Sequence, residues 1–245
     1  MENTSLIALS RQSGIRRQMA VIANNIANMN TSGFKGEKMM FVEHLVRSKG
    51  GERIWGERIA YVRDIATMRD TTEGPLENTG NPLDIAVRGN GYFVIGSNVG
   101  ERYTRNGHFQ LDSEGQIVTQ QGDPLLSDSG EPFFLSPEDS NITVSRDGTI
   151  STENGELGRI RVVGFENRQD MRMVAGGLLA TDKEPQDVDN PDLVQFMLES
   201  SNVQPIIEMT RMIETHRAYD SVKKLIEKED DRQQKMIQEY GKVAA

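Results

Sequence analysis

The residues of this chain that could do chemistry fall into three groups, and the first is a glycine-rich turn. Gly89-Asn90-Gly91 begins like a dinucleotide-binding loop, whose backbone N–H groups hold a pyrophosphate at the start of a helix. Such a loop needs a third glycine or another small residue at position 94, where this chain has Val94 inside a strand-like run. We therefore predict a hairpin turn between two strands.

The second group consists of the histidines His44, His108 and His216. They lie far apart in different predicted elements, and none has another histidine four positions on, as a zinc-binding helix requires. His216 is expected on the packed face of the last helix, where an imidazole makes a structural hydrogen bond unless a catalytic partner is placed beside it. We predict no metal site and no catalytic histidine.

The third group is the acidic run Asp187-Val188-Asp189-Asn190-Pro191-Asp192, whose oxygens could bind calcium. It lacks the turning glycine and the late bidentate glutamate of a calcium loop, so we predict a solvated surface loop. The chain also has no cysteine and no Gly-x-Ser-x-Gly elbow, which excludes a thiolate nucleophile and that type of hydrolase. We predict no catalytic residue, no cofactor and no metal, and hence a protein that is not an enzyme.

The composition excludes further classes of function. A formal net charge of −9 argues against nucleic acid as the main partner. No apolar run reaches the 18 residues or so that a membrane-spanning helix needs. The short apolar segment at residues 6–9 precedes its arginines, whereas a secretory signal has the opposite order. We expect a protein that stays in the cytoplasm or leaves it without a cleaved signal.

The elements that position these residues begin with a helix predicted over residues 3–30. Its apolar side chains recur at intervals of four and three residues, the spacing of a helix packed on other helices. They are Ile15, Met19, Ile22, Ile26 and Met29. Beside them lie Asn24, Asn25 and Asn28, which either are simply exposed or fix the packing register, as a polar residue next to an apolar seam can.

A second helix is predicted from residue 203 to the end, with Asn202 as its cap. One face carries Met209, Met212, Tyr219, Val222 and Ile226. Isolated helices of this kind are marginal in water. We therefore expect the two ends of the chain to pack against each other and to leave apolar surface for neighbouring molecules.

Between these helices the pattern changes. Residues 37–49 are predicted to form one or two helical turns, and residues 57–80 an extended linker. From residue 81 short strands recur with turn signals such as Asp147-Gly148 and Asn154-Gly155, which is typical of a sandwich or barrel. The predicted fold is α+β, with a discontinuous coiled-coil domain from residues 1–36 and 201–245, a linker at 37–80 and an all-β domain at 81–200.

Several segments resemble the bacterial flagellar rod and hook proteins. Residues 23–35 (ANNIANMNTSGFK) are similar to their N-terminal signature, and residues 79–93 (TGNPLDIAVRGNGYF) to their central motif. Residues 103–109 continue that motif, while residues 198–203 (LESSNV) and 208–213 (EMTRMI) resemble the C-terminal signature. Hook proteins are longer and the smallest rod proteins lack so complete a β domain, so the resemblance favours a basal-body rod protein.

This resemblance implies a structural subunit of the flagellar basal body that assembles through its terminal helices into a helical axial tube and transmits motor torque to the hook. Its partners would be other copies of itself, other rod proteins and, in transit, the flagellar type III export apparatus. The seam residues and asparagines named above would form the assembly interface. The resemblance favours a subunit of the proximal rod, with a protein of the distal rod as the alternative within the family. An alternative from another class is a β-domain binding module on a coiled-coil oligomerisation stalk.

Overall fold

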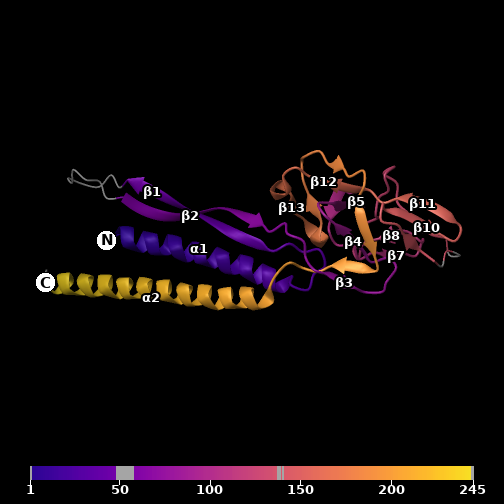
Figure 1. The fold of residues 1–245 in the computed structure, drawn as a ribbon. Coiled ribbons are helices and arrows are strands. Elements are labelled where there is room, and N and C mark those ends of the chain that lie inside the picture. Colours follow the sequence, from indigo (N-terminus) through magenta and orange to yellow (C-terminus); the bar gives the residue numbers. More distant parts are fainter. Residues whose placement is uncertain (1, 48–57, 137–138, 140, 244–245) are drawn as a thin grey trace. The chain divides into compact units, whose positions relative to one another are not determined.

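The computed structural model describes residues 2–47, 58–136, 139 and 141–243 (Figure 1). The chain divides into two compact units. A helical unit contains Met1–Ala27, Glu37–Met68 and Gln204–Ala245, and a β-rich unit contains Asn28–Gly36 and Arg69–Val203. Each unit is thus built from segments that are distant in the sequence.

The helical unit is organised by two long helices that run antiparallel, α1 (Glu2–Ala27) and α2 (Pro205–Val243) (Figure 1). On α1 the buried apolar side chains include Ala8, Ile15 and Ile22. The less exposed positions of α2 recur at intervals of four and three residues. This line includes Glu208, Met212, Thr215, Tyr219, Val222, Ile226 and Glu229. The predicted pairing of the two ends of the chain is confirmed.

The same unit contains a two-stranded ribbon of β1 (Glu37–Arg47) and β2 (Arg58–Arg69). The predicted helical turns at residues 37–47 are therefore wrong, and positions 48–49 lie outside the described residues. Strand β2 likewise occupies much of the predicted linker. The apolar run Met39-Met40-Phe41-Val42 has no helical period, and such a run is compatible with either element until a neighbouring strand supplies backbone partners.

The β-rich unit consists of short strands around a six-stranded sheet in the order β13-β14-β6-β5-β12-β15. Its strands are β3 (Leu76–Asn78), β4 (Ile85–Arg88), β5 (Tyr92–Ser97), β6 (Gly100–Thr104), β7 (Gln110–Leu111), β8 (Ile117–Val118), β9 (Thr143–Val144), β10 (Thr149–Thr152), β11 (Gly155–Arg159), β12 (Val162–Gly164), β13 (Arg172–Met173), β14 (Leu179–Ala180), β15 (Gln186–Asp187), β16 (Asp192–Gln195) and β17 (Met197–Glu199). Two 3₁₀ turns, η1 (Arg168–Asp170) and η2 (Ala175–Gly177), precede β13 and β14.

The core of this unit lies on both faces of the central strand β5. Phe93 and Ile95 join one buried cluster, while Tyr92 and Val94 join a second one. Successive side chains of a strand point to opposite faces, so β5 is apolar at every buried position. In the larger cluster Phe93 packs edge-to-face against Phe109, with ring centroids 5.3 Å apart. The sheet is therefore covered on both sides within its own unit.

The predicted turns are mostly confirmed. Asp147-Gly148 lies between the paired strands β9 and β10. Asn154 lies between the paired strands β10 and β11, and Gly155 is the first residue of β11. Gly89-Asn90-Gly91 does turn the chain, with φ +77° at Gly89. It is not a hairpin, however, because β4 pairs with β16 and β5 pairs with β6 and β12. The α+β class is confirmed, whereas a coiled coil and a sandwich or barrel remain predictions.

Candidate functional site

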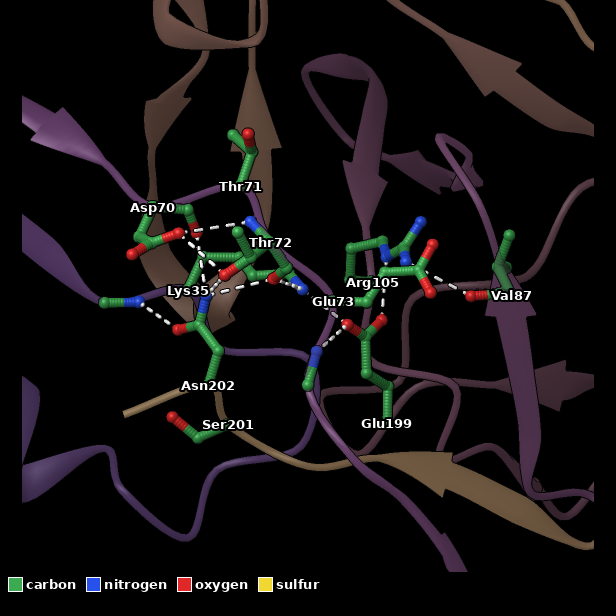
Figure 2. A network of polar contacts seen from close by, with 12 residues as sticks. Lys35, Asp70, Thr71, Thr72, Glu73, Val87, Arg105, Glu199, Ser201 and Asn202 are labelled. Atoms are coloured by element: carbon green, nitrogen blue, oxygen red, sulfur yellow. Dashed lines mark hydrogen bonds and ion pairs between the residues drawn. The ribbon is translucent and has the colours of Figure 1, made fainter. Parts of the chain in front are cut away.

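The most buried polar group of the β-rich unit is the carboxylate of Glu199, at the end of β17 (Figure 2). Its Oε2 accepts a hydrogen bond from Arg105 Nε at 2.9 Å. Its Oε1 accepts from the backbone N–H of Gly74 at 2.9 Å and from Lys35 Nζ. Glu199 is 2% exposed, and Lys35 and Arg105 are each 6% exposed. A charge this deeply buried is tolerated only when it is paired and hydrogen-bonded, and here it has two cations.

Arg105 connects this carboxylate to the turn after β4. Its Nη1 donates to the carbonyl oxygens of Gly89 at 2.7 Å and Gly91 at 2.6 Å, and its Nη2 donates to that of Val87 at 3.1 Å. The fixed fork of a guanidinium suits several such acceptors at once, which a lysine could not match. The turn that resembled a nucleotide loop therefore presents its carbonyl oxygens to a cation of the same chain.

Asn202 adds a second set of contacts beside Glu199. Its Oδ1 accepts from the backbone N–H of Gly36 at 2.8 Å, and its Nδ2 donates to the carbonyl oxygens of Asp70 at 2.9 Å and Thr72 at 3.0 Å. Lys35 Nζ also donates to the carbonyl oxygen of Thr72 at 2.7 Å. Asn202 thus joins backbone segments and is not the cap of α2, which begins three residues later at Pro205.

These contacts define what we call the neck network, namely Lys35, Arg105, Glu199 and Asn202 with their backbone partners. It ties together three segments of the β-rich unit, at residues 33–36, 70–74 and 199–202 (Figure 2). Gly33 contributes by donating its N–H to the carbonyl oxygen of Glu199 at 2.7 Å. Only a glycine suits this position, because its φ is +71° and a Cβ would lie 2.5 Å from the backbone of Arg105.

The charges of the neck network reinforce one another. Burial alone would raise the pKa of Glu199, but the charge of Arg105 and the hydrogen bonds from Lys35 and Gly74 outweigh it and hold this pKa below its usual value. Burial lowers the pKa of Lys35, and the carboxylate of Glu199 opposes that shift. Glu199 therefore stays ionised at neutral pH, and its negative charge faces two positive ones.

A second buried polar contact lies in the helical unit. Asn25, in α1, is 3% exposed. Its Nδ2 donates to the carbonyl oxygen of Glu37 at 2.8 Å and to Glu208 Oε2 at 3.3 Å, and its Oδ1 accepts from the N–H of Glu37 at 2.9 Å. Glu208 also accepts from Arg211 Nη1 at 2.6 Å. Asn25 therefore links α1, α2 and the first residue of β1.

The structure places the other predicted α1 residues as follows. Ile15 and Ile22 are buried and Met19 and Ile26 are half-buried, whereas Met29 follows the end of the helix. Of the remaining asparagines, Asn24 is exposed and Asn28 is half-buried beyond the helix end.

On α2, four of the five predicted residues follow the four-and-three line. Met212, Tyr219, Val222 and Ile226 are half-buried, whereas Met209 is exposed because Glu208 occupies the line instead. Sequence reasoning missed Glu208, Lys35, Arg105 and Glu199. Their signal was weak: they are single charged residues inside the motifs that carried the resemblance.

The described part of the chain contains no group of three His, Cys, Asp or Glu side chains that could hold a metal ion. His108 Nδ1 lies 2.6 Å from the buried Asp84 Oδ1, next to Asn81, which also bonds that oxygen. His216 is exposed, with Asp220 one turn away, since the packed line passes through position 215. Asp187 lies in β15 and accepts from Arg161, so the acidic run begins in a strand.

Neither helix of the described chain combines the length and apolar character needed to cross a bilayer. The buried polar side chains described above form hydrogen bonds and ion pairs with partners within the chain. These bonds join segments of backbone. What this arrangement can do is mechanical: it fixes the relative positions of chain segments.

Three family models match the chain, in sequence order. They are described as "Flagella basal body rod protein" at residues 6–35, "Flagellar hook protein FlgE/F/G D1 domain" at residues 86–152 and "Flagellar basal body rod FlgEFG protein C-terminal" at residues 194–239. These ranges overlap the segments that carried the resemblance in the sequence, although residues 79–85 of the central motif lie outside them.

Similar proteins match over nearly their whole length. The chain is 37% identical to the flagellar basal-body rod protein FlgF of Caulobacter vibrioides, over 99% of this chain and 100% of that protein. It is 30% identical to FlgF of Rhizobium meliloti, over 98% and 99% of the two chains. A flagellar basal-body rod protein FlgG of Buchnera aphidicola is 31% identical, over 90% of this chain and 93% of its own.

Proposed function

Because the chain belongs to the flagellar basal-body rod protein family, and is thus a structural subunit of the basal body and not an enzyme, we propose that it assembles through its terminal helices into the axial tube of the rod. In that tube the helices of neighbouring subunits pack as a coiled coil. The subunits together transmit motor torque to the hook.

The observation that carries this proposal is the apolar surface that the helix pair leaves uncovered. On α2, Ile206 is 81% exposed, and Met209 and Ile213 are also exposed. These three residues recur at intervals of three and four, and they lie off the line formed by Glu208, Met212 and Thr215. A surface helix normally buries its apolar stripe, so a second stripe supports packing against helices of other subunits.

Exposed apolar side chains also occur on α1, where Leu6 and Leu9 are each about half exposed. The proposed assembly interface combines these exposed side chains with the residues predicted from the sequence. That predicted set is Ile15, Met19, Ile22, Asn24, Asn25, Ile26, Asn28, Met29, Met209, Met212, Tyr219, Val222 and Ile226. Within it, Ile15, Ile22 and Asn25 hold the two helices of one subunit together, and the exposed members face neighbours.

The neck network supports a mechanical role for the β-rich unit. Its ion pairs and backbone hydrogen bonds join three segments that are distant in the sequence. Separating the segments would break these bonds together and leave buried charges without partners, so we expect the segments to resist being pulled apart. We expect this unit to pass force between subunits without local unfolding.

The partners of the subunit are other copies of itself, other rod proteins and, during transit, the flagellar type III export apparatus. The proposed domain scheme has helical parts at 1–27 and 204–245 in place of the predicted 1–36 and 201–245. Its β domain extends the predicted 81–200 to include residues 28–36 and 69–80, because these cluster with the strands. The scheme assigns Glu37–Met68 to the helical unit, in which they cluster, and no longer to a linker.

The proposal predicts that Ile22→Asp abolishes rod assembly and swimming, because it places a charge in the buried line between α1 and α2. Ala20→Asp is the matched control, since it adds the same charge to an exposed position of the same helix. Rods are scored by electron microscopy of isolated basal bodies and motility by spreading in soft agar. Normal swimming of the Ile22→Asp strain would contradict a role for the helix pair in assembly.

A further inference from the structure

Phe196 adopts a backbone conformation that is unfavourable for its side chain. Its φ of 65° makes it the single non-glycine residue with positive φ among those the structure describes. A Cβ at such an angle approaches the following carbonyl oxygen, and a bulky residue there is a genuine outlier. Strain of this kind persists where the surrounding structure imposes it, and it clusters at functional positions.

The strain comes from a break in a strand. Phe196 separates β16, which pairs with β4, from β17, which pairs with β3. Its carbonyl oxygen accepts from Thr79 N at 2.9 Å, which fixes the backbone. A residue in the left-handed region at such a bulge is ordinarily glycine, and a glycine would make the same hydrogen bond without strain.

Packing within the chain does not account for a phenylalanine at this position. The ring keeps 42% of its surface exposed, so much of the benefit of burying it is not realised within the subunit. A contact with another molecule would bury the exposed part of the ring and so gain the remaining free energy of burial.

The β-rich unit also contains a cavity suited to an aromatic ring. Its volume is about 260 Å³, and its walls include the buried side chains of Phe34, Tyr92 and Leu179. A cavity of about 150 Å³ already accommodates benzene. Met173 also lines it and is 42% exposed, and Gly176 adds no side chain at its edge.

The chemistry of this cavity favours an aromatic occupant over an aliphatic one. Tyr92 and Met173 line it, and the cations Lys35 and Arg105 on its wall are already paired with Glu199. Aromatic rings pack favourably edge-to-face against a tyrosine, and a methionine sulfur makes favourable contacts with ring edges. Val174, beside Met173, is a further exposed apolar side chain next to the lining.

We propose that the Phe196 ring of one subunit inserts into this cavity of the next copy of the same chain. Phe196 is not among the residues that line the cavity, so one copy can present its ring while its own cavity receives the ring of another copy. In a helical rod this contact repeats in one direction and is head-to-tail, whereas a reciprocal contact would give only closed dimers. Head-to-tail contacts that do not close into a ring generate open helical assemblies. The inference therefore rests on the proposed assembly of the rod and names one of its contacts.

The absence of natural cysteine allows a direct test by disulfide cross-linking. Phe196→Cys and Met173→Cys are introduced together, and isolated basal bodies are oxidised. We expect covalent trimers and larger species, because each subunit links in both directions, whereas each single variant gives no such series. The matched control combines Phe134→Cys with Met173→Cys, since Phe134 is exposed but does not line the cavity.

Two outcomes overturn the contact. One is the lack of covalent trimers from rods that contain the double variant, and the other is linkage of Cys-substituted position 196 to a different rod protein, identified by mass spectrometry. If the wild-type protein is not found in isolated basal bodies, the proposed assembly into the rod is itself wrong.

A second variant tests the strain independently. Phe196→Gly relieves the unfavourable φ, so we expect the purified variant to melt at a higher temperature than the wild-type protein. We also expect bacteria that carry the variant to swim less well, because the ring is lost from the subunit contact. Phe134→Ala serves as the control for loss of an exposed ring and should swim normally. A lower melting temperature for Phe196→Gly, or normal swimming, would overturn the assignment of this ring to a subunit contact.

Discussion

Glu199 illustrates how a single residue can organise distant parts of a chain. Its carboxylate is buried between Lys35 and Arg105 and also accepts the N–H of Gly74. A buried ion pair is weak support for overall stability, because well-packed apolar residues often do as well. Its value here lies in geometry, since one side chain holds three segments at defined positions.

We predict that Glu199→Gln lowers the free energy of unfolding of the β-rich unit by about 3–5 kcal/mol. The change leaves the charges of Lys35 and Arg105 buried without their counterion. Urea unfolding, followed by near-ultraviolet circular dichroism of the buried Tyr92 and Tyr103, measures the effect. The control is Glu77→Gln in β3, an exposed position where a change within about 0.5 kcal/mol is expected. Equal stability of the two variants would refute the role given to Glu199.

The same carboxylate gives a defined pH dependence. Because the pKa of Glu199 in the folded protein lies below its usual value of 4.5, the folded state binds the proton more weakly than the unfolded state. The stability from this group is complete above pH 4.5 and is lost as the pH falls through the folded pKa. We expect the difference in unfolding free energy between wild type and Glu199→Gln to shrink below that pH. A difference independent of pH would show that the carboxylate contributes no linked stability.

None of the neck network could be predicted as a site from the sequence. Lys35, Arg105 and Glu199 are single charged residues with no local pattern, and 94 residues separate Arg105 from Glu199. Their proximity arises only when the strands pair. Asn202 was predicted to cap a helix because its type favours caps, but the backbone N–H of Gly36 supplies a better-placed donor.

At the scale of elements, the four-and-three spacing was a reliable guide to the terminal helices. It predicted the buried Ile15 and Ile22, and most of the line on α2. The prediction that Met209 lies on the packed face of α2 was wrong by one residue. Glu208 belongs to that face instead, where it accepts a hydrogen bond from Asn25. The β1–β2 ribbon was missed because its stability depends on strand pairing, which has no signature in a short apolar run.

The contact between Asn25 and Glu208 is predicted to couple the two helices energetically. A polar pair at a packed line specifies register, because any shift leaves both groups buried without partners. In a double-mutant cycle with Asn25→Ala and Glu208→Ala, we expect a coupling energy of about 0.5–3 kcal/mol in unfolding free energy. Replacing Asn25→Ala by Asn24→Ala, at an exposed position of the same helix, should give an additive cycle. Additivity in the Asn25 cycle would exclude a role in register.

At the scale of the whole molecule, the order of elements followed from the sequence. Two terminal helices enclose a region of short strands, and hydrophobic periodicity distinguishes these patterns well. The grouping of residues 37–68 with the helices did not follow, because it depends on packing contacts between segments that no local signal reports.

The separation between Asn25 and Glu208 has a consequence for timing. The two residues lie 183 positions apart, so α1 is synthesised first and its partner α2 last. Contacts between such distant segments form slowly, whereas the short hairpins of the β-rich unit need only local closure. We expect every newly made chain to pass through an interval in which local hairpins such as β5–β6 and β10–β11 have formed while α1 has not yet packed against α2. In that interval the N-terminal motif at residues 23–35 is accessible to other proteins that bind the newly made chain.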